Sequence, residues 1–175
     1  MLFNEIAYGP IRSRRLGVSL GMEIMPLTHK LCTFDCIYCE CGWNQPISHP
    51  VLPTREEVRK ALEEKLALMQ NEDADLDVIT FSGNGEPTLH PHFLGIIEDT
   101  CMLRNQYYPN AKVSVLSNST QLGRSDVKEA LRLCDNRILK LDAGTDHMMR
   151  LIDLPVNKDL TIDTIVQWLD EWQGD

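Results

Sequence analysis

The 175-residue sequence predicts an α/β fold with about four strand–helix units and a parallel sheet. Short apolar or β-branched runs alternate with amphipathic helical segments, and each run ends in a polar or turn-forming loop. Strands that are each followed by a helix form a parallel sheet, and the crossover connections are right-handed. A closed eight-stranded barrel needs ~250 residues, so this pattern leaves a choice between an open sheet and part of a barrel.

The first strand–helix unit contains a long intervening loop. Residues 18–27, VSLGMEIMPL, predict a short strand that runs into a loop, and residues 42–53 are too rich in Gly, Pro and Asn to be regular. Thr54 and Glu57 form a capping box at the start of a helix. Apolar residues recur along that helix at helical spacing, namely Val58, Leu62, Leu66 and Met69.

The second and third units are shorter. Residues 77–82, DVITFS, predict a buried strand that ends in the loop GNGEP, and a helix follows over residues 92–106. Residues 112–117, KVSVLS, predict the next strand, and its helix begins at about Ser125. Helical spacing puts Cys101 and Cys134 on buried faces, where free cysteine behaves as a small apolar residue.

The fourth unit completes the pattern. A strand from Arg137, RILKLDAG, is followed by a loop that contains Pro155 and by a last helix from about Thr161. Four apolar residues form the stripe of that helix, namely Ile162, Ile165, Leu169 and Trp172. No repeat or second domain is evident, so residues 1–175 are expected to form one domain.

Composition narrows the class of protein. The hydrophobic fraction of 43% is typical of globular proteins and unlike that of disordered chains. No long apolar run and no leader-like start are present, which predicts a cytoplasmic protein that does not bind membranes. The net charge of -9 argues against broad electrostatic attraction to nucleic acid. Arg12, Arg14 and Arg15 form a local basic cluster, for which a solvated surface and an anion contact are equally good interpretations.

Four of the six cysteines lie within residues 30–42, KLCTFDCIYCECG. Thiolates are soft ligands that select iron–sulfur clusters, zinc or copper(I). A structural zinc site has four ligands, often as two pairs that are separated in sequence. A thioredoxin-like Cys36-x-x-Cys39 pair leaves Cys32 unexplained. Three ligands suggest an open position, as in a four-iron cluster whose fourth iron is free to bind another ligand.

Every unusual loop follows one of the predicted strands. The cysteines follow the first strand, residues 83–87 the second, Ser117 and Asn118 the third, and Asp142 the fourth. Because ligand sites in parallel α/β folds form at the carboxyl ends of the strands, we expect these loops to converge.

These residues resemble the radical S-adenosylmethionine (radical SAM) superfamily. The resemblance rests on Cys32-x3-Cys36-x2-Cys39 with Tyr38 inside it and on GNGEP after the second strand, and it covers the chain from about Arg12 onwards. The run GPIRSRRLGVSLGMEIMP further resembles the branch that includes the wyosine-tRNA synthesis enzyme and many uncharacterised iron–sulfur oxidoreductases. The implied fold is a partial (βα) barrel, a truncated radical SAM core.

The resemblance also implies a role for each motif residue. Cys32, Cys36 and Cys39 would hold a [4Fe-4S] cluster, while Cys41 would be a neighbour and not a ligand. The glycine-rich loop would bind the methionine ammonium of SAM, Tyr38 would lie against the adenine, and the later polar residues would reach the ribose or the carboxylate. The full set of expected SAM contacts is Tyr38, Gly83, Asn84, Gly85, Glu86, Ser117, Asn118 and Asp142. Reductive cleavage of SAM would give a 5′-deoxyadenosyl radical that abstracts hydrogen from a substrate.

The family core has six strand–helix units, whereas the sequence predicts four. We therefore expect this chain to be the N-terminal part of a longer core domain, or to be completed by a partner chain. The resemblance implies an electron donor such as flavodoxin or ferredoxin and a substrate that is tRNA or a small molecule, although the acidic balance disfavours tRNA. The alternative function is a zinc-binding or cluster-binding module without turnover, and iron content separates a cluster from zinc.

Overall fold

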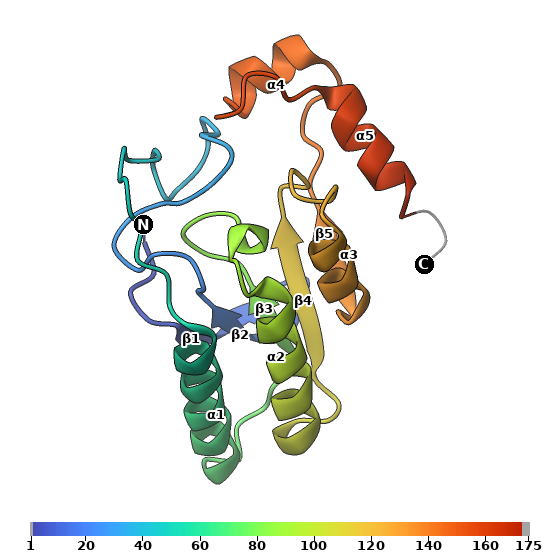
Figure 1. The fold of residues 1–175 in the computed structure, drawn as a ribbon. Coiled ribbons are helices and arrows are strands. Elements are labelled where there is room, and N and C mark those ends of the chain that lie inside the picture. The colour runs from blue at the N-terminus through green and yellow to red at the C-terminus, as the bar shows by residue number, and fades with distance from the viewer. Residues whose placement is uncertain (1, 173–175) are drawn as a thin grey trace.

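The computed structural model describes residues 2–172 and contains one five-stranded sheet whose strand order follows the chain order (Figure 1). The strands are β1 (Ala7–Ser13), β2 (Gly17–Met22), β3 (Val78–Phe81), β4 (Lys112–Ser117) and β5 (Asn136–Leu139). Strands β2 to β5 are parallel, while β1 pairs with β2 antiparallel. A doubly wound sheet would reverse its strand order, so this order confirms the predicted partial barrel of four strand–helix units.

Within residues 2–172, five α-helices accompany the sheet. They are α1 (Arg55–Asn71), α2 (Phe93–Tyr107), α3 (Ser125–Arg132), α4 (Asp146–Ile152) and α5 (Ile162–Asp170), with a 3₁₀ turn, η1 (Pro87–Leu89). Figure 1 shows α1, α2 and α3 along one face of the sheet and α4 and α5 beyond the end to which β4 points. The last two helices therefore stand over the end of the sheet where the predicted site loops lie.

The two faces of the sheet differ in polarity because side chains alternate along each strand. Six buried residues face the helices and form the centre of the core, namely Leu20, Met22, Ile79, Phe81, Val113 and Val115. The opposite face carries small polar residues, and Ser19 Oγ lies 2.8 Å from Thr80 Oγ1. This polar face is the inner wall of the partial barrel.

The helix predicted from its capping box is confirmed. Glu57 N donates to Thr54 Oγ1 at 3.2 Å, and Thr54 N donates to Glu57 Oε2 at 2.7 Å. The four apolar residues at helical spacing are all buried. Both links hold the first turn of α1 because two otherwise unpaired backbone donors find side-chain acceptors.

Two elements differ from the sequence prediction. The strand β1 was not predicted, since Pro10 interrupts it; proline is tolerated there because β1 is an edge strand with an irregular register between Tyr8 and Ile11. The helix α4 occupies part of the predicted loop, where Thr145 caps it by accepting from Met148 N at 3.2 Å. A seven-residue helix has too few turns to show a periodic pattern.

The two cysteines outside the loop have different environments. Cys134 is buried, 4% exposed, as predicted. The prediction of a core position for Cys101 is wrong in part, because this residue is only partly buried at the edge of the core and its Sγ contacts Leu133 O at 3.6 Å. Within residues 2–172, none of the helices has the length and apolar character needed to cross a bilayer.

Candidate functional site

The cysteine loop begins against the glycine-rich loop that follows β3. Leu31 N donates to Asn84 O at 3.0 Å, and Glu86 N donates to Leu31 O at 3.1 Å, so Leu31 and Gly85 form a parallel bridge. This pairing extends the parallel arrangement of β2 and β3 beyond the ends of both strands. It brings the first and second predicted site loops into direct backbone contact.

The cysteine loop is held on its other side by the segment that ends α4. Asp35 N donates to Asp153 O and Ile37 N donates to Ile152 O, both at 2.9 Å. Phe34 also forms an antiparallel bridge with Pro155. The loop therefore lies between two segments that are about 50 and 120 residues further along the chain, and its shape depends on contacts with both.

Two polar residues that the sequence did not single out brace the loop from within. Lys30, 3% exposed, donates from Nζ to Asp35 Oδ1 at 3.1 Å and to Gly42 O at 3.0 Å. The Asn44 side chain pairs with the backbone of Cys32, accepting from Cys32 N at 2.9 Å and donating to Cys32 O at 3.0 Å. Asn44 stands in the irregular connection before α1, so no local pattern marked it.

The four cysteines of the loop are free, partly buried thiols. Cys32 Sγ accepts from Asn118 Nδ2 at 3.4 Å, and Cys36 Sγ accepts from Lys140 Nζ at 3.6 Å. Cys41 Sγ instead contacts Gly83 O at 3.3 Å. Burial raises the pKa of Cys32 to about 11 and also raises the pKa of Cys36, so without a metal both are neutral thiols at pH 7.

The separation of these thiols bears on the kind of metal group that they could hold. Among residues 2–172, no three His, Cys, Asp or Glu side chains gather closely enough to hold one metal ion. A zinc ion needs all its ligands at one point, whereas each cysteine of an iron–sulfur cluster binds a different iron. Asn118 and Lys140 each place an N–H donor against one of these sulfur atoms.

Close neighbours explain both glycines of the GNGEP loop, a backbone carbonyl at Gly85 and a side-chain carboxylate at Gly83. A Cβ on Gly85 would lie 1.7 Å from Leu31 O, and a Cβ on Gly83 would lie 1.9 Å from Glu23 Oε2. The Asn84 side chain is buried and donates to Phe3 O at 2.8 Å and Pro26 O at 3.0 Å. The Asn84 side chain thus ties the N-terminal segment to the loop, leaving only its backbone near the cysteines.

Glu86 joins the second and third site loops. Its Oε1 accepts from Thr88 N at 3.1 Å and Thr88 Oγ1 at 2.6 Å, and its Oε2 accepts from Asn118 N at 2.6 Å. Burial raises the pKa of this carboxyl group. Glu86 is only 2% exposed, so these contacts hold its carboxylate between the two loops. Ser117 lies beside it, and Ser117 Oγ accepts from Ser119 N at 3.1 Å.

The fourth site loop meets the cysteine loop through Tyr38. Tyr38 is about half exposed as a residue, and its hydroxyl donates to the carboxylate of Asp142. Partial desolvation of the hydroxyl, together with this contact, raises the pKa of Tyr38. Lys140 lies between them and forms an ion pair with the buried Asp153, Nζ to Oδ1 at 2.6 Å. Burial lowers the pKa of Lys140, but the contact with Asp153 outweighs it and the pKa is raised overall.

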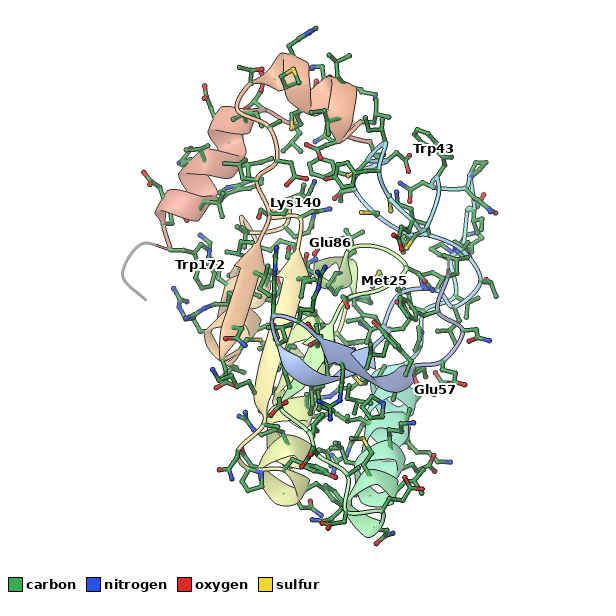
Figure 2. All side chains as sticks on the ribbon, turned by 180° about the vertical axis from the view of Figure 1, so that it is seen from behind. Met25, Trp43, Glu57, Glu86, Lys140 and Trp172 are labelled. Carbon is green, nitrogen blue, oxygen red and sulfur yellow. The ribbon has the colours of Figure 1, made fainter. Side chains whose placement is uncertain are left out.

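All four predicted site loops therefore meet at the carboxyl end of the parallel strands, around the cysteine loop. Figure 2 shows Lys140 and Glu86 at this end of the sheet. The basic cluster lies elsewhere: Arg12, Arg14 and Arg15 are exposed on β1 and the turn before β2, at the amino end of that strand. The structure thus separates these arginines from the cysteines.

A buried carboxyl group beneath the glycine-rich loop makes the folding stability depend on pH. Glu23 Oε1 accepts from Met25 N at 2.6 Å, Oε2 accepts from Asn84 N, and burial raises the pKa of Glu23 to about 7. A raised pKa favours folding below the ordinary value of 4.5, and this contribution is lost as pH rises to about 7. Between pH 4.5 and 8, we expect the free energy of unfolding of the metal-free Glu23→Gln protein to fall by about 3 kcal/mol less than that of the wild type.

Urea unfolding at several pH values measures this difference. Because Glu86 also has a raised pKa, only the difference in slope between the two proteins reports on Glu23. Parallel stability curves for the wild type and the variant would contradict the expectation.

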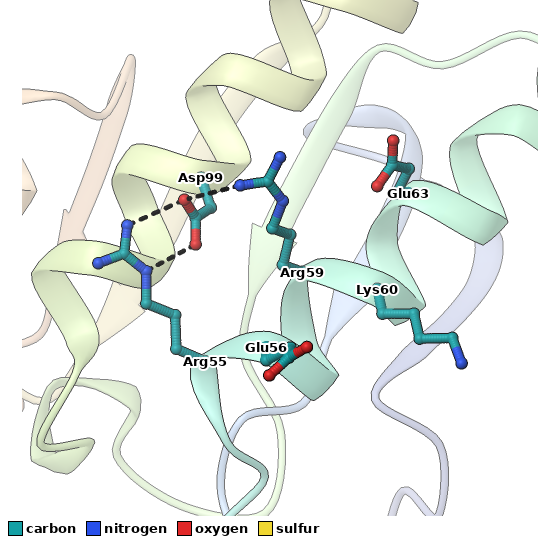
Figure 3. Close-up of a pocket in the computed structure, with 6 residues that line it drawn as sticks. All are labelled: Arg55, Glu56, Arg59, Lys60, Glu63 and Asp99. Carbon is teal, nitrogen blue, oxygen red and sulfur yellow. Dashed lines mark hydrogen bonds and ion pairs between the residues drawn. The ribbon is translucent and has the colours of Figure 1, made fainter.

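A separate groove of about 660 Å³ lies between α1 and α2 (Figure 3). Its lining is charged, and Arg55 holds Asp99 through two hydrogen bonds, Nε to Oδ2 at 2.7 Å and Nη2 to Oδ1 at 2.9 Å. The groove contains none of the predicted site residues. Its charges of opposite sign compensate one another, which is typical of a solvated helix surface.

Comparison with known proteins agrees with the chemistry of the loop. The family model described as "Radical SAM superfamily" matches residues 27–173. The matched region begins just before the cysteine loop and includes all four site loops.

Three similar proteins illustrate the extent of the match. The UPF0026 protein MJ1312 of Methanocaldococcus jannaschii is 33% identical over 97% of this chain and 51% of its own length. A UPF0026 protein of Helicobacter pylori strain J99 is 34% identical over 97% of this chain and 53% of its own length. A Brachyspira hyodysenteriae protein named GTPase Obg is 32% identical over 95% of this chain and 23% of its own length. The chain spans about half the length of the UPF0026 proteins it matches.

Proposed function

Because this chain belongs to the radical SAM superfamily, we propose that it binds a [4Fe-4S] cluster through Cys32, Cys36 and Cys39 and cleaves SAM reductively. The observation that carries the proposal is the position of these thiols: they lie on a loop that is hydrogen-bonded directly to GNGEP, and two of them face N–H donors. When bound, the cluster supplies one electron to the sulfonium of SAM, and the resulting 5′-deoxyadenosyl radical abstracts hydrogen from a substrate.

The surrounding residues would position the cofactors. Asn118 orients the Cys32 sulfur through its side-chain amide and the Glu86 carboxylate through its backbone N–H. The carbonyl groups of the GNGEP loop, together with the Glu86 carboxylate, are proposed to accept hydrogen bonds from the ammonium group of SAM. Tyr38, Ser117 and Asp142 are proposed to contact the rest of SAM, since Ser117 lies beside Glu86 and Tyr38 joins the cysteine loop to Asp142.

Several parts of the proposal concern the wider protein. We propose that residues 1–175 are the N-terminal part of a radical SAM core, completed by further chain or by a partner, since the UPF0026 relatives are about twice as long. An electron donor such as flavodoxin or ferredoxin would reduce the cluster. We also propose that the protein belongs to the branch that includes the wyosine-tRNA synthesis enzyme and that it is cytoplasmic. It would be an oxidoreductase that acts on tRNA or on a small molecule.

Anaerobic reconstitution followed by reduction tests this function. We expect about four irons per chain and formation of 5′-deoxyadenosine from SAM with dithionite, and neither from Cys36→Ala. A colourless, zinc-loaded protein would contradict the cluster. A fully loaded cluster that never cleaves SAM would contradict turnover by this chain and would indicate a cluster-binding module.

A further inference from the structure

The ammonium group of Lys140 lies against Cys36, one of the three proposed ligand cysteines. This group has three N–H donors and three acceptors within reach: Asp153 Oδ1 at 2.6 Å, Asp142 Oδ2 at 3.1 Å and Cys36 Sγ at 3.6 Å. The ammonium also lies 4.9 Å from the ring centre of Phe34 and 5.6 Å from that of Tyr38. Two carboxylates and two rings thus fix the group so that its remaining donor faces the sulfur.

The surroundings of Lys140 are built for a permanent positive charge. Asp153 is 3% exposed and its carboxylate also lies 3.5 Å from Cys36 Sγ, so a thiolate at Cys36 would face a buried negative charge. Lys140 contacts both groups and compensates the repulsion between them. Asp153 is tied to the cysteine loop through its backbone as well, because its carbonyl accepts from Asp35 N.

We propose that Lys140 is a positioning residue that donates a hydrogen bond to the Cys36 thiolate and raises the reduction potential of the proposed cluster. The inference rests on the proposed function, since it needs the cluster at Cys36. Adding an electron to a cluster increases its negative charge, and a nearby cation or N–H donor on a ligand sulfur stabilises that reduced state. The surrounding carboxylates hold the lysine in place; the lysine acts on the cluster through the sulfur.

The midpoint potential of the reconstituted cluster, measured by anaerobic titration with EPR detection, tests the proposal. We expect a shift to more negative potential in Lys140→Met and little change in Lys140→Arg, which keeps the charge. Lys112→Met is the matched control, because it removes one positive charge at the amino end of β4, away from the cysteines. An unchanged potential in Lys140→Met with a full cluster would overturn the proposal while leaving cluster binding and SAM cleavage intact.

A second measurement detects the lysine nitrogen directly. With ε-¹⁵N-labelled lysine, pulsed EPR of the reduced wild-type cluster should show coupling to a lysine nitrogen, and this coupling should persist in Lys30→Arg, which removes the buried lysine of the cysteine loop. Its absence from the wild-type spectrum would overturn the hydrogen bond. Failure of the wild type to take up iron would instead reject the proposed function itself.

Discussion

Replacing Cys41 with alanine should leave the iron content and SAM cleavage of the reconstituted protein unchanged, whereas alanine at Cys32, Cys36 or Cys39 should reduce both to background. The three motif cysteines are the proposed ligands, and loss of one thiolate leaves an iron of the cluster without its protein ligand. Cys41 faces the carbonyl of Gly83 in this structure. Iron analysis, the EPR spectrum of the reduced cluster and 5′-deoxyadenosine formation measure the outcome for each variant.

Cys101→Ala is the matched control for loss of a cysteine, because Cys101 lies on α2 at the edge of the core. It should match the wild type in all three measurements. Loss of iron in Cys41→Ala would mean that the fourth thiol of the loop is a ligand and would contradict an open iron for SAM. Full iron content in any one of the three motif variants would remove that cysteine from the ligand set.

Gly85→Ala should destabilise the protein and prevent cluster binding. A Cβ at this position would lie 1.7 Å from the carbonyl oxygen of Leu31, and a backbone atom cannot rotate away as a side chain can. The bridge between the GNGEP and cysteine loops must then open, which moves Cys32 relative to Glu86 and Asn118. Overpacking costs about 1–3 kcal/mol, and the backbone clash places this variant at about 3 kcal/mol.

Chemical denaturation of the metal-free protein and iron content after reconstitution measure the two effects. Gly144→Ala is the matched control, because no atom lies within 4 Å of a Cβ built there. It should retain both stability and iron. Wild-type iron content in Gly85→Ala would show that the cysteine loop does not depend on its contact with the glycine-rich loop.

Most of the architecture could be predicted from local patterns. The capping box and apolar spacing of α1 and the short β-branched runs of β3 and β4 depend on residues that are neighbours in sequence. The strand β1 could not be predicted in this way, because its extended conformation depends on pairing with β2 around an internal proline. The helix α4 is too short for its own periodicity to stand out.

In the candidate site too, some residues are marked by a local sequence motif and others are identified only by their tertiary contacts. The cysteine spacing and GNGEP are short motifs, so the sequence showed the thiols, the two glycines and Glu86 directly. Lys140 and Asp153 had no such signal. Their relevance comes from distances to Cys36, which is more than 100 residues away in the chain.

The sequence by itself therefore determined which residues could carry the chemistry: three cysteines at fixed spacing, and a polar loop after each predicted strand. The tertiary structure shows how they are held. The cysteine loop is hydrogen-bonded to the GNGEP loop on one side and to the end of α4 on the other. The physical reason is that ligand spacing is a local covalent property of the chain. The partners of each thiol, by contrast, come from segments that meet only when parallel pairing aligns the strand ends.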